Sequence, residues 1–391
     1  MDSPRTNSEN PAAADWQGLG DLIAIGTERL TRPVEGVHRA ITDRWAALAG
    51  PWGAPVRHVS RAFASPVYAS IRLIGSGVGR TVGFVATTEA GSKHLRPLWK
   101  SRLGGGVQSF VNGLWGDEFE RQQSQLSIEM SIRSEDGYPI GADARSLVEV
   151  FPEATPRLVV LLHGLGDTED IWRPKEGKGA LAETLIDHSF NPLLVRYNSG
   201  RSLADNGKDL SRLLEEVVGN WPIAVDDISL IGHSMGGLVA RSCLLAAHHA
   251  GHRWRDRAGH IVTVGTPHLG APIEKSVNWM SRGLAYATVS RPIGEFVNQR
   301  SAGIKDLRMG LKEDTDPAVE HHFVAGTVTS KPDRLLGRLV GDLVVPVRSA
   351  TGASRKTPRS PGEVRVLGGR NHRDLIHDPS VHEEILIWLE A

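Results

Sequence analysis

The pentapeptide Gly232-His233-Ser234-Met235-Gly236 has the residue types and spacing that can turn a serine hydroxyl into a nucleophile. It follows an apolar run at residues 228–231 and precedes a helical pattern over residues 235–250. A G-x-S-x-G sequence between a strand and a helix is typical of a nucleophile elbow, whose tight turn lifts the serine above the sheet. The flanking glycines keep side chains away from the crowded backbone. We therefore predict that Ser234 is the nucleophile of an acyl-transfer reaction.

A second signal lies upstream, where the strand predicted at residues 157–162, uniformly apolar from residue 158 on, ends in His163-Gly164-Leu165-Gly166. An acyl-transfer enzyme must stabilise an oxyanion, and fixed backbone amides do so without reorganisation. In this arrangement one amide belongs to the residue after the nucleophile, Met235, and the other to the loop after the earlier strand, Leu165. Taken alone, His163-Gly164 would indicate an ordinary turn at the end of a strand.

A general base and its orienting acid must follow the serine in the order serine, acid, histidine. Asp342 lies in the segment GDLVVP, and His372 lies in NHRDLI after the strand predicted at residues 363–367. In such a site the histidine takes the serine proton, while the aspartate holds the tautomer and stabilises the imidazolium. The motif positions favour Asp342 and His372 over the competing residues, which are Asp306, Asp333, His377 and His382.

The elements that must position these residues follow an alternating pattern after residue 116. Apolar β-branched runs alternate with helical patterns, which is typical of a mostly parallel α/β sheet. Predicted strands lie at residues 126–134, 146–151, 157–162, 191–197, 228–231, 260–264, 322–328 and 363–367. Predicted helices lie at residues 179–188, 202–218, 235–250 and 381–391.

These motifs together resemble the α/β-hydrolase superfamily, on the side of bacterial lipases and esterases and of inositol-deacylase-like proteins. The matching segments, in chain order, are LVVLLHGLGDT, YNSGRSLADNGKDLSRLLEE, LIGHSMGG, VGTPHLGAP, GDLVVP and NHRDLI. The resemblance implies an α/β-hydrolase domain over residues 116–391, with a central sheet flanked by helices. It also implies the triad Ser234, Asp342 and His372, and an oxyanion hole formed by the amides of Leu165 and Met235.

A long insertion at residues 268–311 interrupts the alternation, and the resemblance identifies it as a lid. Insertions of this length are more often functional lids than slack connections. Its large apolar residues would line an entrance for an apolar acyl group, although they could instead anchor the lid to the core. These predicted substrate contacts are Trp279, Met280, Leu284 and Phe296.

Residues 1–115 are predicted to form a helical extension, with residues 1–15 disordered. An apolar stripe at helical spacing begins at Leu30 and ends at Leu48, and a core-facing role is the simpler interpretation. Residues 29–102 hold twelve Lys or Arg against three Asp or Glu, so peripheral binding to an anionic membrane is the second interpretation. The two differ in what the stripe packs against.

Composition excludes several other classes of function. The chain has 391 residues with 45 basic and 45 acidic side chains, which argues against a dedicated nucleic-acid binder. The single cysteine, Cys243, excludes an internal disulfide framework, and a reducing compartment is the easier interpretation. The clusters His248, His249, His252 and His321, His322 lack a recognisable ligand set, so no metal and no cofactor is predicted. We expect a cytoplasmic protein, with peripheral membrane contact through residues 1–115 as the alternative.

The predicted function is a serine carboxylic-ester hydrolase that acts through an acyl-enzyme on small-molecule or lipid esters with an apolar acyl group. Two alternatives stay open at this point. An acyltransferase would keep the same triad but exclude water in favour of another acceptor. A non-catalytic, membrane-associated protein could keep the fold without the activity, since fold alone does not define function.

Overall fold

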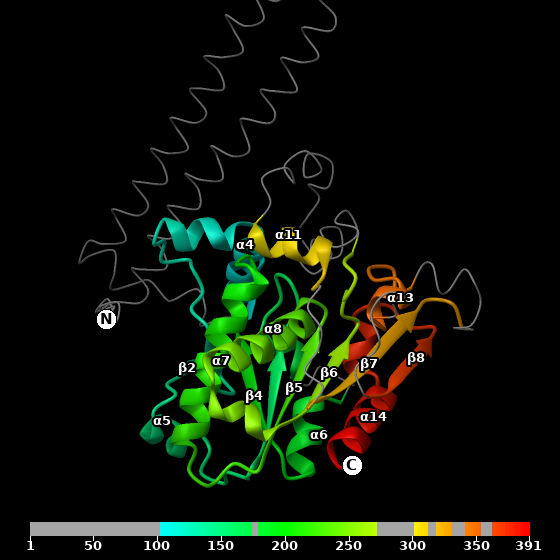
Figure 1. Ribbon diagram of the computed structural model, residues 1–391. Helices are drawn as coiled ribbons and strands as arrows, with labels where there is room; N and C mark the ends of the chain where they lie inside the picture. The colour runs from blue at the N-terminus through cyan, green and yellow to red at the C-terminus, as the bar shows by residue number, and fades with distance from the viewer. Residues whose placement is uncertain (1–101, 174–178, 272–300, 312–317, 331–340, 353–361) are drawn as a thin grey trace, which may run out of the picture. The chain divides into compact units, whose positions relative to one another are not determined.

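A sheet of eight strands forms the centre of the computed structural model, which describes residues 102–173, 179–271, 301–311, 318–330, 341–352 and 362–391 (Figure 1). The strand order is β2-β1-β4-β3-β5-β6-β7-β8, in which β1 pairs antiparallel with β2 and β4 and all other pairs are parallel. The strands are β1 (Ser131–Arg133), β2 (Pro139–Ile140), β3 (Arg157–Leu162), β4 (Asn191–Arg196), β5 (Asp227–His233), β6 (Ala258–Val264), β7 (Glu320–Thr327) and β8 (Val364–Gly368). The predicted fold class, an α/β-hydrolase fold with a mostly parallel sheet, is confirmed.

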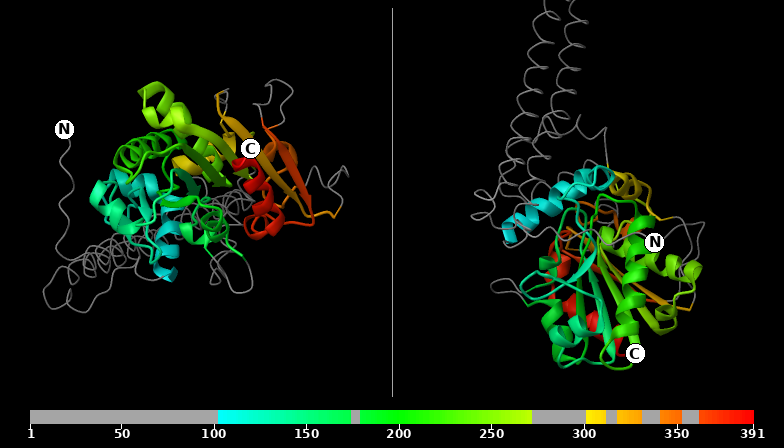
Figure 2. Two further views of the ribbon diagram at one scale, coloured as in Figure 1. Left: turned by 90° about the horizontal axis from the view of Figure 1, so that it is seen from below. Right: turned by 90° about the vertical axis from the view of Figure 1, so that its left-hand side faces the viewer.

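Helices cover both faces of this sheet (Figures 1 and 2). Helices α7 (Leu203–Asn220) and α8 (Met235–Ala250) pack together on one face, and α6 (Leu181–Asp187) and α14 (Pro379–Leu389) cover the other. Strand β3 is buried along nearly its whole length, as its uniformly apolar sequence predicts for a strand covered on both sides. Within the described residues, no helix has both the length and the apolar character needed to cross a bilayer.

Three further helices lie at the end of the sheet where the parallel strands terminate, namely α4 (Arg102–Arg121), α11 (Ala302–Met309) and α13 (Val347–Ala350) (Figure 1). The domain boundary predicted near Gly116 falls inside α4. The apolar stripe from Leu30 to Leu48 lies outside the described residues, so the role of the N-terminal extension stays a prediction.

The segment predicted as a strand at residues 146–151 is instead helix α5 (Ala144–Val150), and that prediction was wrong. Asp143 caps the helix: its carboxylate accepts the Ser146 amide at 3.1 Å and the Ser146 hydroxyl at 2.6 Å. Only Leu147 is buried, so the valines that suggested a strand face outward on a short helix. Capping by a local aspartate therefore outweighed β-branched composition. The strand predicted at residues 126–134 is also much shorter, and its partner β2 was not predicted.

A buried ion pair fastens the 3₁₀ helix η3 (Glu169–Trp172) to strand β4. Both carboxylate oxygens of Glu169 accept hydrogen bonds from the Arg196 guanidinium at 2.6 Å, and the two side chains are 0% and 4% exposed. Burial alone would raise the pKa of Glu169, but the hydrogen bonds and charge of Arg196 outweigh it and hold that pKa below its usual value. The carboxylate therefore stays charged inside the protein.

Replacing Glu169 with glutamine should lower the free energy of unfolding at neutral pH by about 3–5 kcal/mol, because Arg196 would keep its charge without its partner. A depressed folded pKa contributes stability above the unfolded value of about 4.3, and this contribution is lost as pH falls toward the folded value. Urea denaturation of wild type and variant between neutral and acidic pH should therefore show their difference shrinking in acid. The exposed Glu216→Gln is the control and should change stability by no more than about 0.5 kcal/mol.

Candidate active site

Ser234 occupies a strained turn between β5 and α8. Its backbone has φ 54° and ψ −120°, a conformation that residues other than glycine rarely adopt, and its amide donates to the Val264 carbonyl at 2.8 Å. The flanking glycines are sterically required. A Cβ on Gly236 would lie 2.4 Å from the Leu162 carbonyl oxygen, and one on Gly232 would lie 2.2 Å from the Gly237 nitrogen. This geometry matches the turn of a nucleophile elbow.

The structure brings Asp342 and His372 together. His372 Nδ1 lies 2.6 Å from Asp342 Oδ2, and the two side chains are 1% and 0% exposed. The other carboxylate oxygen of Asp342 accepts the Val344 and Val345 amides at 3.0 and 2.8 Å, which fixes its orientation. Because a carboxylate only accepts, the neutral imidazole carries its proton on Nδ1. Its Nε2 lone pair is then the one that can take a proton.

Two neighbouring residues, His233 and Gly265, place His372 and Asp342 next to the turn at Ser234. His233, which directly precedes Ser234, donates from Nε2 to the His372 carbonyl at 3.1 Å, and the two rings lie 4.7 Å apart. Burial lowers the pKa of His233 well below its usual value, with the charge of His372 as the next cause, so the ring is neutral. Gly265 makes room for the base: a Cβ there would lie 3.1 Å from His372 Nδ1 and 3.3 Å from Asp342 Oδ2.

The loop after β3, residues 163–168, lies beside Ser234 and is called the oxyanion loop below, after the role predicted for Leu165. The Asp167 amide donates to the Gly164 carbonyl at 3.2 Å, and Gly166 at φ 69° completes a tight turn. The Gly166 amide donates to Ser199 Oγ at 2.9 Å. The neighbouring Leu165 amide is then the candidate donor from this loop. A Cβ on Gly164 would lie 3.3 Å from the Ser234 Cβ, so the loop and Ser234 are adjacent.

Met235 supplies the second candidate amide, because it is the first residue of α8. Amides in the first turn of a helix have no partner within the helix and point out of its N-terminus. The Met235 side chain is buried under the start of α11, where a Cβ on Gly303 would lie 3.1 Å from Met235 Cε. The structure thus places both predicted oxyanion residues, Leu165 and Met235, at the end of the sheet that carries Ser234.

His163 supports the oxyanion loop through hydrogen bonds to Gly164 and Tyr197. Its Nδ1 donates to the Gly164 carbonyl at 2.8 Å, its Nε2 accepts the Tyr197 amide at 3.3 Å, and its ring stacks on Tyr197. Burial lowers the pKa of His163 to about 4. The Tyr197 hydroxyl donates to the His163 carbonyl at 2.7 Å. This neutral, fully bonded histidine is a structural element of the strand end.

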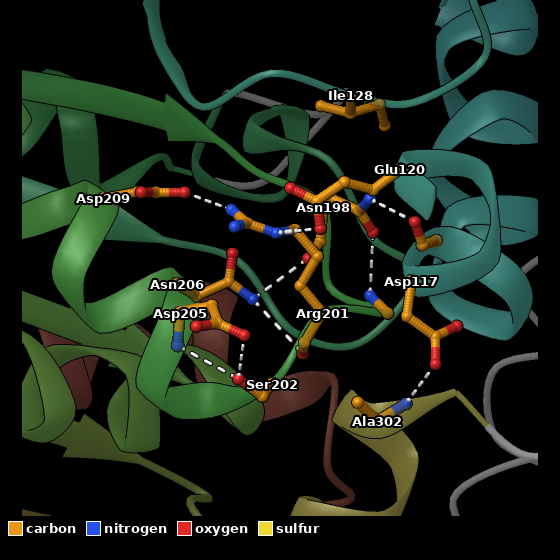
Figure 3. Close-up of polar contacts among 12 residues, drawn as sticks. Asp117, Glu120, Ile128, Asn198, Arg201, Ser202, Asp205, Asn206, Asp209 and Ala302 are labelled. Atoms are coloured by element: carbon orange, nitrogen blue, oxygen red, sulfur yellow. Dashed lines mark hydrogen bonds and ion pairs between the residues drawn. The ribbon is translucent and has the colours of Figure 1, made fainter. Parts of the chain in front are cut away.

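The loop between β4 and α7 also contacts the neighbouring helices (Figure 3). Besides the Ser199 contact, Asn198 Nδ2 donates to the Gly116 carbonyl of α4 at 2.9 Å. Arg201 pairs with Glu120 of α4 at 2.7 Å and also with Asp209 of α7. The Gly303 amide of α11 donates to the Gly200 carbonyl at 3.0 Å. This loop therefore connects helices α4 and α11 to the site.

The competing acids and bases are engaged elsewhere or lie outside the described residues. Asp306 accepts the Leu203 amide at 2.9 Å, and His382 Nε2 donates to the Ile376 carbonyl at 2.7 Å. His377 lies in the 3₁₀ helix η5 (Asp374–His377). The residues outside the described part of the chain are Asp333 and the predicted lid contacts Trp279, Met280, Leu284 and Phe296.

One trio of side chains within the described residues has the spacing of metal ligands. His260 Nδ1 lies 3.2 Å from His322 Nε2, and Glu320 Oε2 lies within 3.8 Å of both. The hydrogen bonding argues against coordination. The Glu363 amide donates to His322 Nδ1 at 3.2 Å, and burial lowers the pKa of His322 to about 4, so the neutral ring carries its proton on Nε2. A protonated nitrogen cannot bind a metal. His322 instead accepts the Glu363 amide at Nδ1 and donates from Nε2 to His260 Nδ1.

Sequence reasoning overlooked four residues that contact the site. Ser199 holds the oxyanion loop, His233 holds the carbonyl of His372, and Asp167 pairs with Arg373. All four were part of the segments that carried the resemblance. Their roles are visible only when loops distant in sequence meet, so the motifs gave their positions but not their partners.

Comparisons with known proteins agree with this fold. Residues 152–310 match the family described as "Putative serine esterase (DUF676)". A protein described as "Putative carbamate hydrolase RutD" from Azorhizobium caulinodans is 29% identical over 112 residues, which span 28% of this chain and 39% of that relative.

Among solved structures, a lipase of Bacillus licheniformis is 17% identical, with a TM-score of 0.43, and the alignment covers 67% of this chain and 97% of that one. A lipase of Staphylococcus hyicus is 13% identical, with a TM-score of 0.38 and coverage of 60% and 95%. The sheet order, the turn at Ser234 and the family match together confirm the resemblance seen in the sequence. The chain is an α/β-hydrolase-fold protein, and its residues 152–310 match a family described as "Putative serine esterase".

Proposed function

We propose that the protein is a serine carboxylic-ester hydrolase in which Ser234 is the nucleophile, His372 the base and Asp342 the acid. The observation that carries this proposal is the buried hydrogen bond of 2.6 Å between His372 and Asp342, held by His233 directly before a strained Ser234. This arrangement supports the roles that acyl transfer needs, with residues that follow three different strands.

The reaction would proceed through an acyl-enzyme. Ser234 Oγ attacks the ester carbonyl carbon while its proton passes to His372 Nε2, and the amides of Leu165 and Met235 bind the oxyanion. The intermediate collapses by breaking the bond to the alkoxy oxygen, which leaves as the alcohol with the proton from His372. Water then attacks the acyl-enzyme by the same route, which releases the carboxylic acid and restores Ser234.

An apolar acyl group suits the surroundings of the proposed site. Leu269, Met309 and Leu343 are 44%, 58% and 47% exposed. Leu269 lies in the segment after β6, and Met309 is the last residue of α11. Leu343 adjoins Asp342, and a Cβ on Gly270, the neighbour of Leu269, would lie 3.3 Å from the Met309 carbonyl carbon. Exposed apolar side chains near a site favour an apolar ligand.

Hydrolysis of p-nitrophenyl esters with short and long acyl chains tests this function. We expect a burst of p-nitrophenol followed by steady turnover, with higher kcat/KM for longer chains. A burst that stops until an alcohol is added would indicate an acyltransferase instead. No burst, together with no labelling by a fluorophosphonate probe, would contradict a catalytic role altogether.

A further inference from the structure

An ion pair joins the oxyanion loop to the loop that carries the proposed base. Arg373 directly follows His372, and its Nη2 donates to Asp167 Oδ1 at 2.8 Å. The two partners lie 206 residues apart in the sequence, one after β3 and the other after β8. The contact therefore links two parts of the site that no hydrogen bond within either loop could hold together.

The Asp167 carboxylate lies close to the nucleophile. Its other oxygen, Oδ2, is 3.3 Å from the point where a Cβ on Gly164 would lie, and the Ser234 Cβ is also 3.3 Å from that point. Asp167 Oδ2 and the Ser234 Cβ are therefore separated by at most twice that distance. The Asp167 side chain is only 9% exposed, so little water screens its charge.

This position creates an electrostatic problem for the proposed reaction. Acyl transfer at Ser234 places a negative charge on the substrate oxygen, which the oxyanion loop must stabilise. A partly buried carboxylate at this distance would repel that charge and oppose the two amide donors. The guanidinium of Arg373 supplies the opposite charge on the same carboxylate. Exposed ion pairs contribute little, but here one partner is largely removed from water.

We propose that Arg373 is a positioning residue that cancels the charge of Asp167 beside the oxyanion hole. This inference rests on the function proposed above. Arg373 does not reach the reacting atoms in this role; it acts through Asp167. Its neighbour Arg370 pairs instead with Asp378, at the start of α14, and is therefore a matched control on the same segment.

Steady-state kinetics of four variants test the proposal. Arg373→Gln should lower kcat by about 10- to 100-fold with little change in KM, because without the Arg373 charge the Asp167 carboxylate repels more strongly the charge that appears only in the transition state. Adding Asp167→Asn to Arg373→Gln should restore most of kcat, since the double variant carries neither charge. Arg373→Lys should stay closer to wild type, and Arg370→Gln should match wild type. Thermal unfolding of every variant checks that each is folded.

A double variant no more active than Arg373→Gln would overturn the proposal, because the loss of activity would then not arise from the charge of Asp167. Wild-type kcat in Arg373→Gln would also overturn it. Failure of the proposed function is a separate result: the wild-type protein would then neither hydrolyse p-nitrophenyl esters nor react with the fluorophosphonate probe, whatever the variants do.

Discussion

Replacement of Ser234 by alanine is expected to abolish labelling by a fluorophosphonate probe and to lower ester turnover by about four to six orders of magnitude. The probe bonds covalently to an activated serine oxygen, so removing Oγ removes the only atom that it could label in this site. Turnover falls because the acyl-enzyme cannot form. Gel fluorescence of the probe adduct and initial rates on a p-nitrophenyl ester measure the two effects.

Ser229→Ala is the matched control for this experiment. Ser229 is also buried on β5, but its hydroxyl donates to Asp227 at 3.1 Å and lies away from the elbow. This variant should keep both labelling and turnover. The strained backbone at Ser234 is an independent check, because alanine at φ 54° relieves no strain and the variant should unfold at nearly the wild-type temperature. Full labelling of Ser234→Ala would show that the nucleophile has been misassigned.

The parallel core was predictable because its strands are covered on both faces. The uniformly apolar sequence of β3 gave its bounds, residues 157–162, as observed, and α8 was predicted over its observed range. The hydrophobic pattern predicted the wrong element at the solvent-exposed edge of the sheet. At residues 146–151 most side chains face water, so apolar pattern carried little information and the Asp143 cap decided for a helix.

The candidate site was predictable to the extent that each residue belongs to a short motif. The strand-to-helix turn explains the glycines around Ser234, and the segment GDLVVP contains amides that bind the Asp342 carboxylate. Contacts between motifs could not be predicted in the same way. The Ser199 hydroxyl on the Gly166 amide and the Arg373 guanidinium on Asp167 depend on how three loops meet above the sheet. No local sequence pattern predicts these contacts between distant loops.

The choice of base gives the second large expected effect. His372→Ala should lower kcat/KM by several orders of magnitude, whereas His377→Ala should stay near wild type, although the two histidines are five positions apart. The physical difference is that His372 donates to the buried Asp342 carboxylate, whereas His377 is the last residue of the 3₁₀ helix η5. Kinetics on a soluble ester, with thermal unfolding to check the fold, compare the two variants directly.

Asp342→Asn tests the same assignment from the other side of the hydrogen bond. The asparagine fits the same space, but an amide nitrogen in place of Oδ2 donates toward His372 Nδ1 and favours the tautomer with its proton on Nε2. That tautomer cannot accept the Ser234 proton, so turnover should fall by about four orders of magnitude while the fold is kept. The Val344 and Val345 amides would still bind the remaining oxygen and hold the loop. If His377→Ala were inactive and Asp342→Asn nearly normal, the base and the acid would both have to be sought among other residues.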